Sequence, residues 1–369
     1  MKKLGFGMMR LPTIDGVIDI GTVEKMADDF IARGFTYFDT AYMYHNGKSE
    51  YALRDAVVKR HDRSEFTVAD KMPMMFVKEA ADLDRIFAEQ KEKCGVDYFD
   101  YYLLHALDAS RYEIVQRTNA FGFISDKKRK GEIKNIGFSF HDSAAVLDTI
   151  LTDHPEVDFV QLQINYLDWE SDNVQSRLCY ETARRHNKQI VIMEPVKGGT
   201  LARLPDEVTA EMKSSAPDMS PASWAVRYCA SLDSVLTVLS GMSDRAQLDD
   251  NTSYMADFKP LNDSERAIID RAVEKIHSHI TVPCTACEYC VAGCPQSIRI
   301  PELFSLYNAA KQYRSDGSSP GRKQYASAVE GKGKASDCIG CGQCEGMCPQ
   351  HIGIIKLLKD VAANFERSW

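Results

Sequence analysis

From residue 1 to about residue 260, short runs rich in β-branched and aromatic residues alternate with longer amphipathic stretches. This alternation predicts repeated βα units, in which each strand of a parallel sheet is followed by a helix. One amphipathic stretch places Val23, Met26, Phe30 and Ile31 on one helical face and ends at Gly34. The predicted strands cover residues 3–8, 35–40, 65–71, 98–105, 133–139, 158–163, 189–194 and 234–241.

Eight parallel strands with intervening helices in about 250 residues are typical of a (β/α)8 TIM barrel. A doubly wound open sheet is the alternative, but no G-x-G-x-x-G turn follows an early strand. Residues 197–221 are predicted to form a longer loop with a short helix between the seventh and eighth strands. Insertions on this side of a barrel usually serve the active site.

The segment NDSERAIIDRAVEKIHSHI is amphipathic and leads to Pro283 and a cysteine-rich tail. We therefore predict a barrel domain over residues 1–260 and a second domain over residues 261–369. Between the two cysteine runs of this tail, residues 308–336 are rich in Gly and Ser and carry six basic and two acidic residues. This segment is either a solvated connector or a docking patch for an acidic redox partner.

Eight of the 11 cysteines lie in two tail runs, CTACEYCVAGCP and CIGCGQCEGMCP. Both runs read C-x-x-C-x-x-C-x-x-x-C-P, the bacterial ferredoxin pattern for [4Fe–4S] clusters, in which the fourth cysteine of each run binds the other cluster. Zinc is the alternative, although it usually takes two separated C-x-x-C pairs. We predict two cluster sites, one formed by Cys284, Cys287, Cys290 and Cys348, the other by Cys338, Cys341, Cys344 and Cys294.

The three remaining cysteines, Cys94, Cys179 and Cys229, are scattered along predicted helices. We predict that they are small buried apolar residues.

Charge and hydropathy narrow the range of partners. The chain of 369 residues has 45 Lys plus Arg and 53 Asp plus Glu, a formal net charge of −8, which argues against nucleic acid as a partner. The N-terminal stretch lacks the apolar region of a signal peptide, and no segment approaches the ~20 apolar residues of a membrane span. We predict a cytoplasmic protein without a membrane partner.

Polar residues stand where several predicted strands end. Asp39, Lys71 and His105 end the second, third and fourth strands, and Tyr44 follows the second. The C-terminal ends of barrel strands converge on one mouth, so these groups are expected to meet. Together they can reduce a carbonyl: the Lys ammonium is expected to lower the pKa of the Tyr hydroxyl, Asp holds Lys in place, and His orients the substrate oxygen.

At these residues the chain resembles the aldo-keto reductase family over roughly residues 1–260. The resemblance is carried by FDTAYMYHNGKSE, by Lys71 in FTVADK, by His105 in DYFDYYLLH, and by IKNIGFS and FVQLQINY. It implies the (β/α)8 fold, a small carbonyl or alcohol substrate, and a catalytic tetrad of Tyr44 as proton donor with Asp39, Lys71 and His105.

The resemblance also implies NADP(H) or NAD(H) as cofactor. Phe140 and Met193 stand where the family usually has Asn and an aromatic ring, and Gln247 where many members have Arg, so the choice between NADPH and NADH stays open. A flavin in the barrel mouth stays open as well. The implied cofactor contacts are Gly7, Met8, Ser139, Gln161, Met193, Ser240, Gly241, Met242, Arg245, Gln247 and Asn251.

The tail resembles the small, mainly helical ferredoxin-like domains that hold two clusters, and the whole chain is similar to aldo-keto oxidoreductases that carry such a domain. This implies an iron–sulfur oxidoreductase whose clusters exchange electrons with a partner such as a ferredoxin or a flavodoxin. Two alternatives stay open: structural clusters on an ordinary NAD(P)H reductase, and an electron-transfer and docking module whose barrel does not catalyse.

Overall fold

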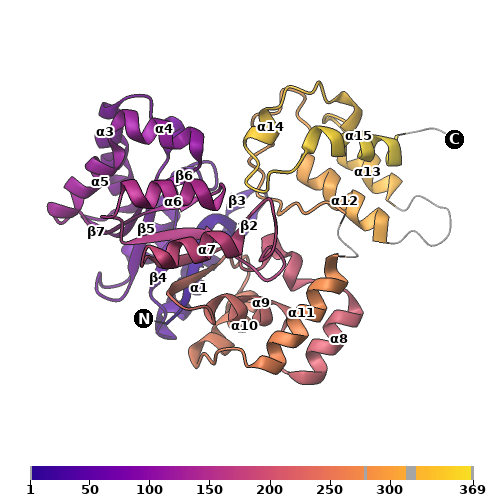
Figure 1. Cartoon of the computed structure of the whole chain (residues 1–369), viewed down its shortest axis with the longest axis horizontal. Coiled ribbons are helices and arrows are strands. Elements are labelled where there is room, and N and C mark those ends of the chain that lie inside the picture. Colours follow the sequence, from indigo (N-terminus) through magenta and orange to yellow (C-terminus); the bar gives the residue numbers. More distant parts are fainter. Residues whose placement is uncertain (1, 278–280, 313–320, 367–369) are drawn as a thin grey trace. The chain divides into compact units, whose positions relative to one another are not determined.

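The structure is a computed structural model that describes residues 2–277, 281–312 and 321–366 (Figure 1). Its internal contacts divide the chain into two compact units. The first unit comprises Met1–Val196 and Met212–Arg266, and the second comprises Lys197–Glu211 and Ala267–Trp369. The predicted boundary after residue 260 remains a prediction.

The first unit is built on a closed barrel of eight parallel strands, which confirms the predicted fold class and each predicted strand. The open sheet is excluded because β1 pairs with both β4 and β10. The strands are β1 Leu4–Gly7, β4 Tyr37–Asp39, β5 Thr67–Met72, β6 Phe99–Leu107, β7 Ile133–Phe140, β8 Phe159–Gln163, β9 Gln189–Met193 and β10 Val235–Ser240.

Helices cover the outside of this barrel (Figure 1). The first of them buries Val23, Met26 and Phe30, with Ile31 partly buried, and ends before Gly34, as its periodicity predicts. The helices of the first unit are α1 Ile20–Ala32, α2 Ser49–Leu53, α3 Ala80–Cys94, α4 Ala109–Thr118, α5 Ala120–Arg129, α6 Ala144–Asp153, α7 Ser176–Arg185, α9 Pro221–Ala230 and α10 Arg245–Ala256.

A small hairpin of β2 Thr13–Ile14 and β3 Val17–Ile18 was not predicted. Its two turn residues, Asp15 and Gly16, both have positive φ, as a type I′ hairpin turn requires. Strands of two residues are too short to show a period, so Asp-Gly is the one sequence signal for this hairpin.

Side chains inside the barrel explain how the candidate site is positioned. Six strands each contribute one residue to an apolar cluster: Tyr37, Ala69, Leu103, Phe159, Val191 and Leu239. Side chains two positions apart on a strand face the same side. The next inward-facing residues on five of these strands are therefore Asp39, Lys71, His105, Gln161 and Met193. The apolar cluster closes the barrel below them, and the polar residues come together above it.

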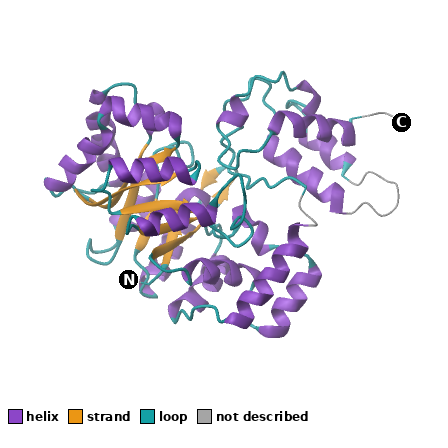
Figure 2. Ribbon diagram, in the orientation of Figure 1, coloured by secondary structure: helices purple, strands orange, loops and turns teal. Residues whose placement is uncertain are grey.

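The second unit is helical (Figure 2), as predicted. Its core contains Ile298, Leu303, Phe304 and Val361. Helices α8 Asp206–Ser215 and α11 Asp263–His277 cross the division between the units along the chain. The other helices are α12 Ile300–Gln312, α13 Arg322–Ala328, α14 Gln343–Gly346 and α15 Ile354–Phe365.

Two segments of the second unit were predicted as a loop and as a possible connector, and both have more structure than those terms suggest. Lys197–Glu211, part of the predicted loop, packs with the cysteine-rich tail, because the backbone of Gly198 lies against the carbonyl of Thr285. The predicted connector 308–336 contains the end of α12 and all of α13, and its residues 313–320 lie outside the described residues. No helix in the described part of the chain is long and apolar enough to span a membrane.

Candidate active site and candidate metal centres

Lys71 and Asp39 form a buried ion pair at the C-terminal end of the barrel. The Lys71 Nζ donates to Asp39 Oδ1 at 2.6 Å and to the backbone carbonyl of Thr40 at 2.7 Å. Neither side chain is more than 3% exposed, so water competes little for these bonds. The two bonds therefore fix the position of the ammonium. The sequence predicted the Asp39 carboxylate as a partner of Lys71, but it could not predict the backbone carbonyl of Thr40.

Tyr44 and His105 lie beside this pair. The Lys71 Nζ is 5.1 Å from the centroid of the Tyr44 ring, and the rings of Tyr44 and His105 meet edge to face with centroids 6.2 Å apart. Both residues are buried. The structure thus brings together the four residues predicted as a tetrad from two strand ends, a bulge and a turn.

Burial sets the protonation states of this group. It raises the pKa of Tyr44 well above its usual range, and the carboxylates of Asp39, Glu194 and Asp70 act in the same direction. The net shift is therefore upward, opposite to the direction expected from Lys71 alone. A phenol in this environment retains its proton near neutral pH.

His105 carries the opposite shift. Burial lowers its pKa well below the usual range, and the positive charge of Lys71 reinforces this effect. The imidazole is therefore neutral, and its Nδ1 has no hydrogen-bond partner among the described residues. A neutral imidazole whose Nδ1 is buried and unpartnered can donate or accept one further hydrogen bond, depending on its tautomer.

A bulge in β6 aims His105. The pairing of β6 with β7 shifts register between Leu104 and Leu107, and Ala106 has φ of 56°. The backbone N–H of Ala106 donates to Ser139 Oγ at 2.7 Å. Bulges next to active sites commonly re-aim a side chain. Ser139 of β7, predicted as a cofactor contact, therefore also accepts a hydrogen bond that stabilises the bulge in β6.

Two other predicted cofactor contacts lie at neighbouring strand ends. Gln161 and Met193 touch each other, with Gln161 Nε2 at 3.3 Å from Met193 Sδ. The Oε1 of Gln161 is buried and has no hydrogen-bond partner among the described residues. Ser139 pairs with Gln161 in the sheet register, so both polar groups reach one patch of the barrel end.

The predicted contacts where β1 and β10 end are tightly packed. The backbones of these two strands approach closely: a methyl group added to Gly7 would meet the carbonyl oxygen of Ser240 at 3.3 Å. The same addition at Gly241 would meet the side chain of Arg10. The side chains of Met8 and Met242 are buried. At Gly7 and Gly241 a ligand could therefore use only the backbone.

Three predicted contacts around α10 have partners within the protein. Arg245 forms an ion pair of 2.6 Å with Asp29. Gln247 accepts from the N–H of Ser243 and donates to Asp244. Asn251 is buried and donates to Ser240 Oγ at 2.7 Å. The structure places these residues near the end of β10 but does not leave them unpaired.

Four tail cysteines line one cavity in the second unit. The cavity is bounded by Cys284, Cys287, Cys290 and Cys348, with Ile300, Phe304, Ile352 and Ile354 among the apolar walls. Burial raises the pKa of the Cys290 thiol to about 12, and Cys287, Cys284 and Cys348 contribute to the shift. Three cysteines of the first run thus lie with the fourth cysteine of the second.

The second set is less enclosed. Cys338 is near enough to help burial raise the pKa of Cys344. A methyl group added to Gly293, which precedes Cys294, would lie 3.5 Å from Gln343, which precedes Cys344. The fourth cysteine of the first run is therefore beside the second run.

A single zinc ion would require closely spaced sulfur atoms. Tetrahedral zinc with Zn–S bonds of about 2.3 Å needs sulfurs about 3.8 Å apart. In the part of the chain that the structure describes, only Glu50, Asp70 and Cys94 bring three potential ligand atoms within 4.8 Å of one another. No three of the tail cysteines meet this limit in the part of the chain that the structure describes.

Sequence reasoning missed the surroundings of Lys71. Asp70 is adjacent in sequence, but alternation points its side chain out of the barrel, toward Glu50 and Cys94. A carboxylate on the covered outer face of a buried strand is the signal that could have drawn attention to it.

A closed (β/α)8 barrel with a buried Lys–Asp pair, a tyrosine and a histidine at its C-terminal end defines a barrel oxidoreductase. The chain belongs to the Aldo/keto reductase family, which matches residues 3–274. Residues 283–352 match a 4Fe–4S dicluster domain.

Known relatives agree with this assignment. An uncharacterized oxidoreductase of Bacillus subtilis, YqkF, is 23% identical over 317 residues, covering 75% of this chain and 95% of the relative. The aldo-keto reductase AKR11C1 from Bacillus halodurans, in its holo form, superposes with a TM-score of 0.59 at 22% identity, covering 73% of this chain and 91% of that one. A Klebsiella pneumoniae aldo-keto reductase in complex with NADPH gives 0.59 at 20% identity, covering 73% and 90%. At these identities the solved structures establish the fold alone.

Proposed function

We propose that the chain reduces a small carbonyl substrate, or oxidises the corresponding alcohol, with Tyr44 as the proton donor. The observation that supports this most strongly is the buried group of Tyr44, His105 and the 2.6 Å pair of Lys71 with Asp39. All four residues lie at the end of the barrel where enzymes of this fold carry their chemistry.

Each residue has a role that follows from its environment. Tyr44 retains its proton until a substrate oxygen accepts it, since burial raises the pKa of the phenol. The Lys71 Nζ lies near the ring, and Asp39 fixes its position. His105, neutral and with a free Nδ1, binds the substrate oxygen and orients it toward Tyr44.

NADP(H) or NAD(H) is the proposed cofactor, and when bound it supplies hydride. The NADPH-bound relative from Klebsiella supports a nicotinamide. The buried Oε1 of Gln161 has no partner among the described residues, so its carboxamide would hold the amide of the ring, with Ser139 and Met193 alongside. Because Arg245 is paired with Asp29, the structure offers no reason to favour NADPH over NADH.

We further propose that the tail holds two [4Fe–4S] clusters, with Cys348 and Cys294 exchanged between the runs. When bound, such clusters carry electrons singly. A ferredoxin or flavodoxin is the proposed partner. Eight thiolate ligands need a reducing compartment, which supports a location in the cytoplasm.

The test is purification without oxygen, followed by spectra on addition of NADPH, NADH or para-nitrobenzaldehyde. We expect carbonyl reduction that Tyr44→Phe lowers by at least about a hundredfold, the scale of general acid catalysis. If Tyr44→Phe leaves the reduction intact, the proposed proton donor is wrong.

The same preparation separates the roles of the clusters. Cluster spectra that respond to a reduced ferredoxin or to substrate support electron exchange with a partner. Clusters that never change redox state while reduction proceeds identify an ordinary reductase with structural clusters. Rapid exchange with an acidic ferredoxin, without binding of any dinucleotide or flavin, identifies an electron-transfer module.

A further inference from the structure

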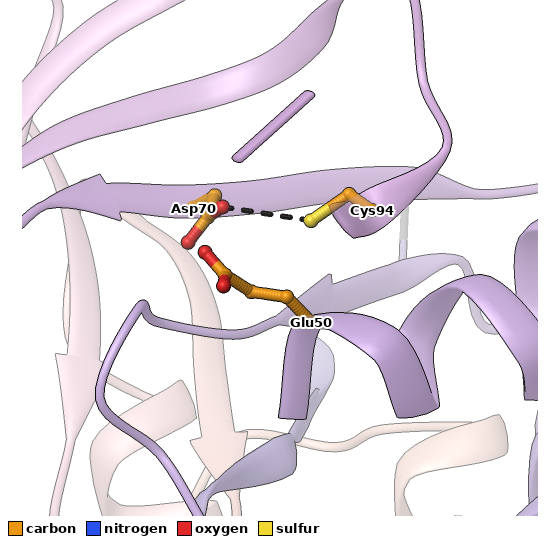
Figure 3. A group of neighbouring side chains, drawn as sticks. All are labelled: Glu50, Asp70 and Cys94. Carbon is orange, nitrogen blue, oxygen red and sulfur yellow. Dashed lines mark hydrogen bonds between the residues drawn. The ribbon is translucent and has the colours of Figure 1, made fainter. Parts of the chain in front are cut away.

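Two carboxyl groups and a thiol lie together on the outer side of β5, behind the candidate active site. Figure 3 shows Glu50 of α2 and Asp70 of β5 turned toward each other, with Cys94 of α3 beside them. All three are fully buried. The thiol of Cys94 donates to Asp70 Oδ2 at 3.5 Å.

Two ionised carboxylates this close would repel strongly in a buried site. One cation approaches Glu50, the Lys93 Nζ at 3.5 Å, and that ammonium also pairs with Glu89 at 2.6 Å. Burial and the charge of Glu50 raise the pKa of Asp70 well above its usual range. Other titratable groups on the surrounding elements interact electrostatically with the two acids or with Lys93. They are Tyr42, Tyr44, Lys71, Glu89, Lys93, Cys94 and Tyr102.

Asp70 and Gln90 hold the backbone of Lys71 from its two sides. The register pairs of β4 with β5 end at Asp39 and Ala69, so Lys71 lies beyond them. Its backbone N–H donates to Asp70 Oδ1 at 2.8 Å, and its carbonyl accepts from Gln90 Nε2 at 3.0 Å. Side chains thus supply the hydrogen bonds to the Lys71 backbone beyond the end of β4.

Gln90 connects this clamp to Glu50. Its Nε2 also donates to Glu50 Oε1 at 3.0 Å, and its Oε1 accepts from the Tyr102 hydroxyl at 2.5 Å. Gln90 is fully buried, so its orientation is fixed by these three bonds. A change in the charge of Glu50 or Asp70 would therefore alter the hydrogen bonds to the backbone N–H and carbonyl of Lys71.

We propose that Asp70 and Glu50 share one proton, with Asp70 donating to the Glu50 carboxylate, and that this acid pair and Gln90 position Lys71 for the proposed reaction. Asp70, Glu50 and Gln90 are positioning residues, because none of them touches Tyr44 or a substrate oxygen. The role of Lys71 rests on the proposed function, whereas the shared proton does not.

The proton is tested by infrared spectroscopy on the full chain near neutral pH. We expect the carbonyl stretch of a protonated carboxylic acid, which Asp70→Asn removes and Glu50→Gln shifts, since the acceptor changes from a carboxylate to an amide. Asp97→Asn, at an exposed aspartate, should leave the band unchanged. A spectrum that Asp70→Asn does not alter would overturn the shared proton.

Positioning is tested without turnover by the Nζ resonance of Lys71 in protein labelled with 15N-lysine. We expect Asp70→Ala to move this resonance and Asp70→Asn to restore it, since Asn can still accept from the Lys71 N–H and donate to Glu50. An unchanged resonance in folded Asp70→Ala would overturn the positioning role. If Asp70→Ala does not fold, Gln90→Leu makes the same test from the carbonyl side.

Kinetics complete the test. With NADPH and para-nitrobenzaldehyde, we expect Asp70→Ala to lower kcat by about tenfold or more with little change in KM, and Asp70→Asn to recover most of that loss. Equal losses in Asp70→Ala and Asp70→Asn would overturn positioning through hydrogen bonds. Absence of carbonyl reduction in the unsubstituted protein would instead refute the proposed function, and the infrared and resonance results would still decide the acid pair.

Discussion

At the scale of single residues, burial governs the candidate site more than any pair of charges does. Tyr44, Asp39 and His105 all have shifted pKa values, and desolvation is the largest cause in each case. Each shift favours the neutral form of its group, although the bond from Lys71 opposes the shift of Asp39. A phenol, an imidazole and a paired ammonium are thus held ready for proton transfer near neutral pH.

The lowered pKa of His105 predicts how stability depends on pH. Below its ordinary value of 6.5, a histidine in the unfolded chain takes up a proton that folded His105 does not. The unfolded state then binds more protons, so the free energy of unfolding falls as pH falls. Relative to His105→Gln, the unsubstituted protein should lose up to about 1.4 kcal/mol for each pH unit below 6.5.

Urea unfolding of both proteins at a series of pH values checks this. The two free energies should differ by a constant amount above about pH 7.5 and should diverge from that difference at lower pH. Parallel curves down to about pH 5 would show that folded His105 titrates normally.

At the scale of elements, the bulge of β6 depends on Ser139 of β7. Ser139→Ala leaves the buried N–H of Ala106 without its acceptor, which typically costs about 1–3 kcal/mol. Ser139→Thr keeps a hydroxyl and should retain more of that stability. The measurement is the urea midpoint, with the imidazole resonances of His105 as a check on its position. If both variants match the unsubstituted protein, the bond does not stabilise the bulge.

The segment that follows β9 makes a second prediction at this scale. Gly198 has φ of 63°, and a methyl group there would lie 2.1 Å from the carbonyl oxygen of Thr285. Gly199 has φ of 98° with nothing within 4 Å, so it is a matched control. Gly199→Ala should cost about 1–2 kcal/mol from backbone strain alone.

Gly198→Ala should cost clearly more, because strain and overlap add, and it should lower the cluster absorbance per chain since Thr285 lies between two cluster cysteines. Thermal unfolding and visible spectra compare the two variants. Equal effects would mean that this segment does not pack against the first cysteine run.

At this scale the sequence predicted features that depend on local patterns, but not features that depend on burial or on pairing of distant elements. The barrel strands were predictable because each is a continuous β-rich run, and strand alternation then brings Asp39, Lys71 and His105 to one end. The raised pKa of Tyr44 was not predictable, because burial is a property of the fold. Glu50 and Asp70 are 20 residues apart, so only pairing of their elements brings them together.

At the scale of the whole molecule, the cysteine tail folds as one unit if its ligands cross. The core of the second unit includes Cys290 of the first run and Cys344 of the second, together with residues of α12 and α15. Cys348 lines the cavity of the first run. Neither run alone can then complete a cluster, so loss of one ligand should disturb residues of both runs.

Crossed ligation predicts which cysteine variants resemble each other. Cys348→Ser should alter the electron paramagnetic resonance signals of the same cluster as Cys287→Ser, and Cys294→Ser the same cluster as Cys341→Ser, because each pair would remove a ligand of one cluster. Uncrossed ligation would instead make Cys348→Ser resemble Cys341→Ser. Spectra of the four variants in dithionite-reduced protein decide between these pairings. Since each cysteine lies in the second unit, activity of the barrel is not needed for the result.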